Sequence, residues 1–301
     1  MAKLDVIKTA TQVTPESAGQ QGPPTQSVSP TSAVAHGYPS AHAIGPVLPA
    51  SVMHSRLLPE VGEAIDFTVV PKMRWEDISP ERSCIQELRE NPFIRKKVPH
   101  IGEIANDVEL KVQDLRFDDD AAQLTRLLDD DELGSCVSYT HDLGLPDGQK
   151  SGNLYFEENK DLRKRDLESR ACMMKTWGVH VHYMLRALGK LPNFEGLVFR
   201  GSPDKEVVKR NYKQGRPIQW GAWTSTATRL ESAQNFTGTD GVIFRITVFT
   251  GKDIGLISFF RTENEVILSP NHRFIVTRAA YEEDGFTYVD LIEQHSTVYY
   301  S

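Results

Sequence analysis

The spacing of hydrophobic residues changes near the middle of this 301-residue chain. Between residues 168 and 188, apolar side chains recur every three or four positions, which predicts a long amphipathic helix. Gly189 and Pro192 are suited to end it. The same spacing predicts one or two helices over 106–128, and a short helix is expected over 80–88.

After residue 192, short apolar runs with alternating polar positions predict strands instead. The predicted strands cover residues 196–201, 218–226, 242–248, 253–257, 265–268, 274–278 and 286–292. Short helices are expected at 204–212 and 231–236, and a short apolar element at 133–140. A helical half followed by a strand-rich half that packs against it indicates an α+β fold.

The first 50 residues differ from the rest in composition. They are rich in Ser, Thr, Pro, Gln, Gly and Ala, and such a segment buries too little apolar surface to offset the entropy of ordering it. We therefore expect 1–50 to be a disordered leader, either an export signal for a non-classical secretion system or a plain flexible tail. It contains no apolar stretch typical of a conventional secretory signal. Residues 51–130 are expected to form a mixed or helical extension, with a strand near 65–70.

Charge and cysteine content exclude several classes of protein. The net charge of −7 and the pI near 5.8 argue against nucleic acid or an anionic membrane as the main partner. The acidic runs 118–120 and 129–132 predict solvated helix ends or loops. Three cysteines are too few and too scattered for a disulfide framework, and no His or Cys spacing suits a metal. No apolar run approaches transmembrane length. We expect the protein to work in a reducing cytosol, its own or another cell's, and to be a monomer.

Two positions in the second half are candidates for binding an anion or a carboxylate. Arg200 ends an apolar strand and precedes Gly201; a guanidinium binds phosphate through two hydrogen bonds, and glycine allows a ligand close to the backbone. A structural ion pair is the alternative for Arg200. Ser225 and Thr226 follow Trp223 at a strand end, where their hydroxyls would either hold a carboxylate or cap the next helix.

Two glutamates directly precede the predicted strand 265–268. On an extended strand, Glu263 and Glu265 would point to the same face, because side chains at i and i+2 do so. The alternative is a strand that leaves a surface loop with two solvated acids. Phe259 and Phe260 lie just upstream in an apolar loop.

In this order, Phe199-Arg200-Gly201, Trp223-x-Ser225-Thr226 and Glu263-x-Glu265 resemble the Arg-Ser-Glu class of mono-ADP-ribosyltransferases. The resemblance covers roughly 133–293. Tracts similar to the family's helical portion are Tyr139-Thr140, Asn159-x-x-Leu162-Arg163 and Ala187-Leu188. The resemblance implies a helical portion packed on a split β-sandwich that binds NAD, with 131–301 as the catalytic domain.

The resemblance also implies a reaction. Such enzymes cleave the bond between nicotinamide and ribose in NAD and pass ADP-ribose to a protein side chain, with no metal. The transition state resembles an oxocarbenium ion, which a carboxylate bonded to the ribose 2′-OH stabilises. The family pattern gives this role to Glu265. Glu263 would orient or deprotonate the acceptor, and Glu at this place goes with arginine as acceptor.

The remaining roles follow from the same family pattern. Arg200 would bind the NAD phosphates, the backbone of Gly201 the nicotinamide amide, and Ser225 would brace Glu265 and the cofactor. Phe236, also explicable as core packing, joins the residues expected at the cofactor. The loop 258–262 would meet the target protein, with Phe259, Phe260 and Glu263 as its recognition residues.

The family's Ser-Thr-Ser is Ser225-Thr226-Ala227 here, so the last hydroxyl is missing, and Trp223 stands where phenylalanine is usual. Neither change removes a catalytic group, so we expect an active enzyme that uses NAD and a target protein with an exposed arginine. The alternatives are a catalytically silent NAD-binding or interaction module on the same fold, or chiefly an NAD glycohydrolase. The leader favours an exported effector or toxin acting in a host cytosol over a resident cytoplasmic enzyme.

Overall fold

The computed structural model describes residues 78–145, 150–164, 166–237 and 241–294. All of them belong to one compact unit, Pro46–Ser301. The predicted disordered leader (1–50) and the predicted strand near 65–70 lie outside the described residues. The proposed boundary between an extension and a catalytic domain near 130 stays a prediction.

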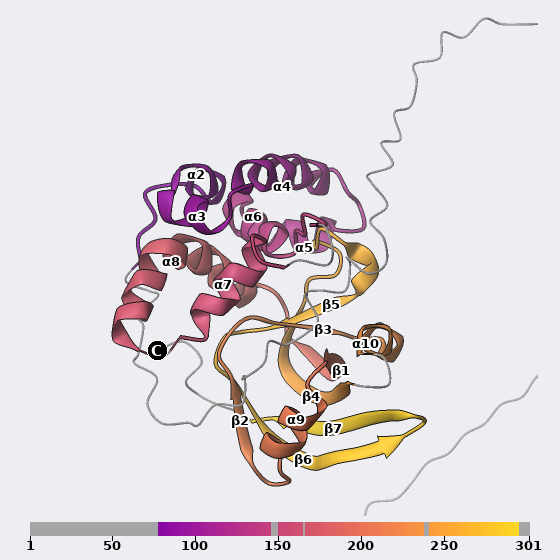
Figure 1. Cartoon of the computed structure of the whole chain (residues 1–301). Helices are drawn as coiled ribbons and strands as arrows, with labels where there is room; N and C mark the ends of the chain where they lie inside the picture. The colour runs from indigo at the N-terminus through magenta and orange to yellow at the C-terminus, as the bar shows by residue number, and fades with distance from the viewer. Residues whose placement is uncertain (1–77, 146–149, 165, 238–240, 295–301) are drawn as a thin grey trace, which may run out of the picture. The chain divides into compact units, whose positions relative to one another are not determined.

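Helices make up the first half of the described chain and lie together in Figure 1. They are α2 (Cys84–Glu90), α3 (Pro92–Lys97), α4 (Ile101–Arg116), α5 (Ala122–Thr125), α6 (Asp130–Tyr139), α7 (Leu154–Leu162) and α8 (Leu167–Lys190). The long amphipathic helix predicted at 168–188 is α8. The apolar element at 133–140 is α6, and the helices predicted over 106–128 are α4 and α5, with α4 beginning five residues earlier than expected.

Polar residues set the ends of several helices. Ser83 caps α2 in a capping box with Gln86. Asn91 ends α2 and its side chain caps α3, in which Pro92 occupies the first turn. Asp129 begins α6 through a second capping box, with Glu132. The local sequence therefore accounts for these boundaries.

The two acidic runs do mark helix ends, but one member is not solvated. The run 118–120 lies in the turn between α4 and α5. Glu132 in the other run is fully buried, and its carboxylate pairs with Lys190 at 2.6 Å and Arg186 at 3.2 Å. The expectation of a solvated charge is wrong for Glu132, because two cations of α8 reach it.

The second half forms one mixed sheet with two short helices. The strands are β1 (Phe194–Ser202), β2 (Pro217–Trp220), β3 (Thr224–Ala227), β4 (Val242–Asp253), β5 (Glu265–Leu268), β6 (His272–Glu283) and β7 (Phe286–Glu293); the helices are α9 (Lys205–Asn211) and α10 (Leu230–Thr237). The order is β1-β3-β5-β4-β7-β6-β2, and β1 also pairs with β4. Strands β1, β3, β5 and β4 therefore close a ring of pairings, from which β7, β6 and β2 continue.

Two strand predictions need correction. The segment 218–226 is not one strand: β2 pairs with β6, whereas β3 pairs with β1 and β5, so its two ends join different parts of the sheet. Residues 254–257 are not a strand, because β4 ends at Asp253 and the chain turns, with Ile257 N donating to Ile254 O at 3.0 Å.

The helical half packs on the β3–β5 region. One hydrophobic cluster joins Trp177 and Val181 of α8 to Trp223, Ile257 and Ile267. A second cluster fills the sheet itself. The expected α+β arrangement, with helices packed on a strand-rich core, is confirmed.

Glu293, at the end of β7, ties three strands together and should make stability depend on pH. Its carboxylate accepts hydrogen bonds from Phe249 N and from Thr250 N and Oγ1, and lies 3.1 Å from His272 Nε2. Burial alone would raise the pKa of Glu293, but His272 and these hydrogen bonds lower it to about 2, from an ordinary value of 4.5. A carboxyl whose pKa is depressed by folding stabilises the fold above its unfolded pKa and loses that contribution as the pH falls.

We therefore expect Glu293→Gln to lower the free energy of unfolding at pH 7 by on the order of 2–3 kcal/mol. The difference from the wild type should shrink as the pH falls below 4.5 toward 2, as measured by urea unfolding at several pH values. A difference that stays constant over this range would contradict the account. Glu283→Gln, at an exposed position of β6, is the matched control.

Candidate active site

Arg200 emerges from the closed part of the sheet and contacts the strand that carries Ser225. It is buried on β1 opposite Phe244 of β4. Its Nη1 donates to Ser225 O at 2.7 Å, and its guanidinium carbon lies 5.9 Å from the centre of the Trp220 ring. Gly201 follows it on β1, buried and opposite Ile243. The structure thus brings the predicted Arg200 and Ser225 together.

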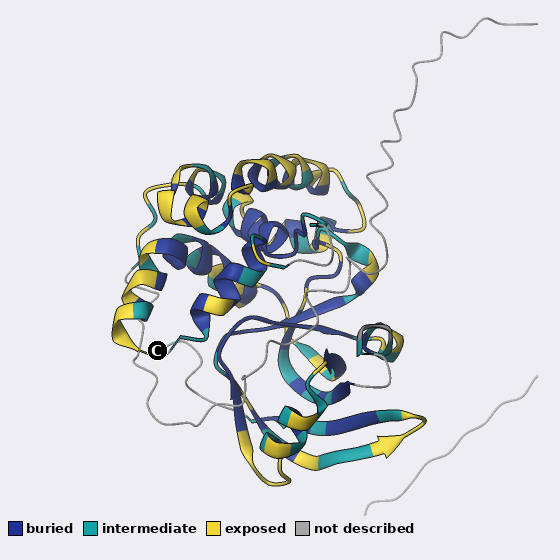
Figure 2. Cartoon of the chain, viewed as in Figure 1, coloured by how far each residue is buried: buried dark blue, intermediate teal, exposed yellow. Residues whose placement is uncertain are grey.

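Ser225 and Glu265 lie on neighbouring strands, β3 and β5, which are buried along their whole length (Figure 2). In the antiparallel register Ala227 faces Glu265 and Ser225 faces Ile267. Opposed residues share a face, and so do residues two apart on a strand. Ser225 and Glu265 therefore lie on one face as diagonal neighbours. This face is the one against the helical half, because Ile267 belongs to the hydrophobic cluster of the helices.

The hydroxyls after Trp223 do not cap a helix. Ser225 and Thr226 lie inside β3, and α10 begins only at Leu230. The Thr226 hydroxyl donates to Val266 O at 2.6 Å, which ties β3 to β5. The alternative interpretation of these residues as helix caps is wrong.

The expected geometry of Glu263 is also wrong, although its position in the chain order stands. Glu263 is not on the strand but ends a short 3₁₀ helix, Arg261–Glu263. Asn264 has a left-handed conformation with φ of 47°, and β5 begins only at Glu265. The i, i+2 rule for strands therefore does not relate the two carboxylates. Both are buried, with 6% of Glu263 and none of Glu265 exposed, so neither is the solvated acid of the alternative interpretation.

The helical half adds a residue that the sequence did not single out as part of the site. The Tyr139 hydroxyl, at the end of α6, donates to Trp223 O at 3.5 Å and accepts from Asn159 Nδ2 at 3.0 Å. Burial raises the pKa of Tyr139 to about 12; the charge of Glu265 acts in the same direction, whereas the nearby Ser225 hydroxyl and the hydrogen bond from Asn159 oppose it. The Tyr139 hydroxyl is therefore neutral and lies close enough to Ser225, Glu265 and Arg200 for each of them to influence its pKa. Its signal in the sequence is the Tyr139-Thr140 tract, which the resemblance places in the family's helical portion.

Tyr139→Phe should lower both stability and activity. The change removes the acceptor of the Asn159 amide in a buried site, which costs about 1–3 kcal/mol, and it removes the donor to the Trp223 carbonyl just before β3. We expect a lower midpoint in urea and slower nicotinamide release from NAD. Tyr155→Phe, which deletes a buried hydroxyl bonded to Asp142, controls for loss of stability alone. Equal activity in Tyr139→Phe and the wild type would contradict a place for Tyr139 beside the site.

The loop before Glu263 packs inward at its start. Ser258 Oγ donates to Glu265 Oε2 at 3.4 Å. Phe259 N donates to Thr140 Oγ1 at 2.8 Å, and the Phe259 ring lies 4.5 Å from that of His141. Phe259 and Phe260 are half-buried, so part of each side chain is exposed. Their predicted role in target recognition stays a prediction.

Phe236 belongs to α10, but its side chain lies outside the described residues. Its predicted place at the cofactor therefore stays a prediction. Ala233 on the same helix packs in the core with Phe199, Ile243 and Tyr288.

Within the described ranges, no group of three or more His, Cys, Asp or Glu side chains is arranged to hold a metal ion. In the same part of the chain, no helix is long and apolar enough to cross a membrane.

Known proteins are similar to this chain in sequence and in fold. The family model for NAD:arginine ADP-ribosyltransferases matches residues 113–298. A protein of Mycobacterium avium (strain 104), named for NAD(+)–arginine ADP-ribosyltransferase activity and called Mav, is 30% identical over 168 residues, which are 56% of this chain and 18% of Mav. The chain thus spans less than a fifth of this relative's length.

Two solved structures have a similar fold. The ADP-ribosyltransferase HopU1 of Pseudomonas syringae pv. Tomato DC3000 matches with a TM-score of 0.51 at 20% identity, over 64% of this chain and 87% of HopU1. The type III effector XopAI of Xanthomonas axonopodis pv. citri matches with a TM-score of 0.52 at 15% identity, over 72% of this chain and 84% of XopAI. At these identities the likeness concerns the fold, whereas the family model covers more than half of the chain. The chain belongs to the NAD:arginine ADP-ribosyltransferase family.

Proposed function

We propose that this chain transfers ADP-ribose from NAD to an arginine side chain of a target protein and releases nicotinamide. The observation that carries the proposal is that β1, β3 and β5 bring their candidate site residues together. Arg200 of β1 donates to the backbone of Ser225 on β3, and Glu265 of β5 shares a face with Ser225. This constellation lies within the residues that match the family model.

Glu265 is assigned the charge that stabilises the transition state. As the bond from ribose to nicotinamide breaks, positive charge develops on the ribose, and a carboxylate held against the 2′-OH opposes it. Full burial of Glu265 supports this role, since a charge acts more strongly away from water. Ser258 Oγ at 3.4 Å from Oε2 helps to orient the carboxylate. Ser225 completes the support from the next strand.

Arg200 and Gly201 are assigned to the dinucleotide. A guanidinium suits a pyrophosphate because it is always charged and offers paired donors. The hydrogen bond to Ser225 O holds the Arg200 side chain in one orientation, which reduces the entropy lost on binding. The backbone of Gly201 would receive the nicotinamide amide, and Phe236 is kept as a further cofactor-binding residue.

Glu263 is assigned to the acceptor. A carboxylate there would hold the incoming guanidinium and accept the proton that it loses when its nitrogen bonds to the ribose. Nicotinamide leaves with the electrons of the broken bond before or as the guanidinium nitrogen bonds to the ribose, so charge and atoms balance. Phe259 and Phe260 would contact the target protein beside that arginine.

Labelled NAD distinguishes this function from its alternatives. Incubation with a cell lysate should place label on protein and release nicotinamide. Free ADP-ribose without labelled protein would instead favour an NAD glycohydrolase. Neither product would indicate a silent module.

We also propose where the chain acts. An effector or toxin that acts in a host cytosol fits the composition of residues 1–50 and the fold shared with the type III effector XopAI. Its presence in infected host cells, detected with an antibody, would support this setting. Restriction to the producing cell would contradict it.

A further inference from the structure

The segment that joins β4 to β5 carries Glu263 in its last turn, and that turn is weakly held by its own backbone hydrogen bonds. Its last turn contains two backbone bonds, Glu263 N to Phe260 O at 3.3 Å and Asn264 N to Arg261 O at 3.4 Å. Both are longer than the usual 2.9–3.0 Å of such bonds. Contacts from elsewhere in the molecule must therefore contribute to its position.

The helical half supplies such contacts at two points. The first lies at the middle of the segment, where Phe259 meets Thr140 and His141. The second lies two residues before Glu263: Arg261 Nη2 forms an ion pair and hydrogen bond with Asp118 Oδ2. Asp118 lies in the turn after α4, 143 positions away in sequence.

Asp118 is well suited to hold Arg261 in place. Its other oxygen, Oδ1, accepts from Asp120 N at 2.9 Å and from Ala121 N at 3.3 Å, so the turn orients the carboxylate. The hydrogen bond from Arg261 is the main influence that lowers the pKa of Asp118, as expected for a carboxylate that binds a cation. The two side chains are 27% and 30% exposed. Ion pairs this exposed contribute little to stability, so their main effect is on position.

The contact acts on one of the two site glutamates more than on the other. Arg261 and Glu263 belong to the same 3₁₀ turn, so a shift of Arg261 shifts Glu263. Glu265 lies beyond the left-handed Asn264 and is held independently by the pairing of β5 with β3 and β4.

We propose that Asp118 is a positioning residue that, through Arg261, fixes the turn carrying Glu263 and so favours transfer of ADP-ribose to a guanidinium over transfer to water. This inference rests on the proposed function. It gives the helical region before residue 130 a part in the choice of acceptor.

The test compares two rates in the full chain: transfer to arginine methyl ester, a small guanidinium acceptor, and hydrolysis of NAD to free ADP-ribose. Asp118→Asn keeps the shape of the side chain and removes its charge. A misplacement of the order of 1 Å lowers rates strongly, so we expect transfer to fall about tenfold, with a higher KM for the acceptor and hydrolysis within about twofold of the wild type.

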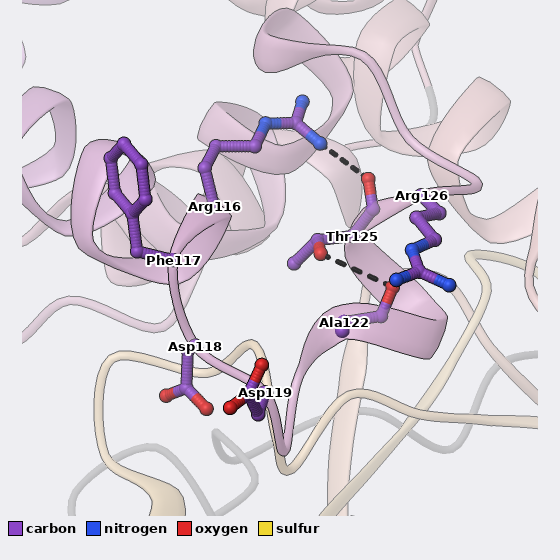
Figure 3. A pocket seen from close by; sticks show the side chains of 7 residues that line it. All are labelled: Arg116, Phe117, Asp118, Asp119, Ala122, Thr125 and Arg126. Carbon is purple, nitrogen blue, oxygen red and sulfur yellow. Dashed lines mark hydrogen bonds between the residues drawn. The ribbon is translucent and has the colours of Figure 1, made fainter.

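Asp119→Asn is the matched control. Asp119 and Asp118 line the same surface pocket of about 350 Å³ (Figure 3), but only Asp118 bonds to Arg261. The control should leave both rates unchanged. In Arg261→Gln, transfer should fall by the same factor as in Asp118→Asn, and the double variant should lose no more than either single one, because both changes remove one interaction.

Two results would overturn the inference: an unchanged ratio of the two rates in Asp118→Asn, whether both rates hold or both fall equally, or the same shift of the ratio in Asp119→Asn. A wild type that hydrolyses NAD but modifies no guanidinium would overturn the proposed function itself, and the inference with it. The two failures are therefore distinguishable.

Discussion

Glu265→Gln is expected to lower nicotinamide release and arginine modification together, by about 10²–10³-fold each. Both reactions pass through the same positively charged ribose, so loss of the carboxylate charge affects whichever acceptor follows. Glutamine keeps the volume of the side chain and still accepts a hydrogen bond from Ser258. The loss would therefore come from charge rather than from packing. Steady-state rates of nicotinamide release, with and without an arginine acceptor, measure the effect.

The fold of this variant needs its own control, because Glu265 is completely buried. Its circular dichroism and urea midpoint should remain close to those of the wild type. Glu283→Gln, at an exposed position of β6, should leave the rates unchanged. A Glu265→Gln protein that is folded and keeps more than about a tenth of the wild-type rate would contradict the assigned role.

Glu263→Gln is expected to separate the two reactions. Arginine modification should fall about 10²-fold, the usual contribution of a positioned acid or base, whereas NAD hydrolysis should fall far less. The structural reason is that Glu263 and Glu265 belong to different elements. Glu263 ends the 3₁₀ turn, and the left-handed Asn264 separates it from β5.

Parallel assays of the same protein, one for modified arginine and one for free ADP-ribose, give the ratio directly. The matched control is Glu282→Gln, since Glu282 is exposed on β6. Equal losses in both assays would place Glu263 in the common step. Undiminished arginine modification would remove it from the acceptor site altogether.

The spacing of apolar residues along the chain predicted the helices and strands that short-range patterns determine. The helical spacing of 168–188 is α8, and the apolar run ending in Arg200 is β1. The order of Arg200, Ser225 and Glu265 was enough to propose a site. The strand pairings then bring the three together through β1, β3 and β5.

Most of what the sequence did not predict depends on contacts between distant segments. The run 218–226 divides between β2 and β3 because its ends pair with different strands, which no local periodicity records. Glu263 leaves the strand because Asn264 adopts a left-handed conformation, which asparagine tolerates better than most residues. Tyr139 and Asp118 reach the site from more than 80 and 140 positions away, respectively, so only the fold reveals their roles.

The most direct test of the account is to identify the modified residue by mass spectrometry. The purified chain, incubated with NAD and an arginine-containing peptide, should attach ADP-ribose to the guanidinium, and Glu265→Gln should attach almost none. Modification of another residue type, or transfer that persists in Glu265→Gln, would contradict the account. Release of nicotinamide without any modified arginine would contradict it as well.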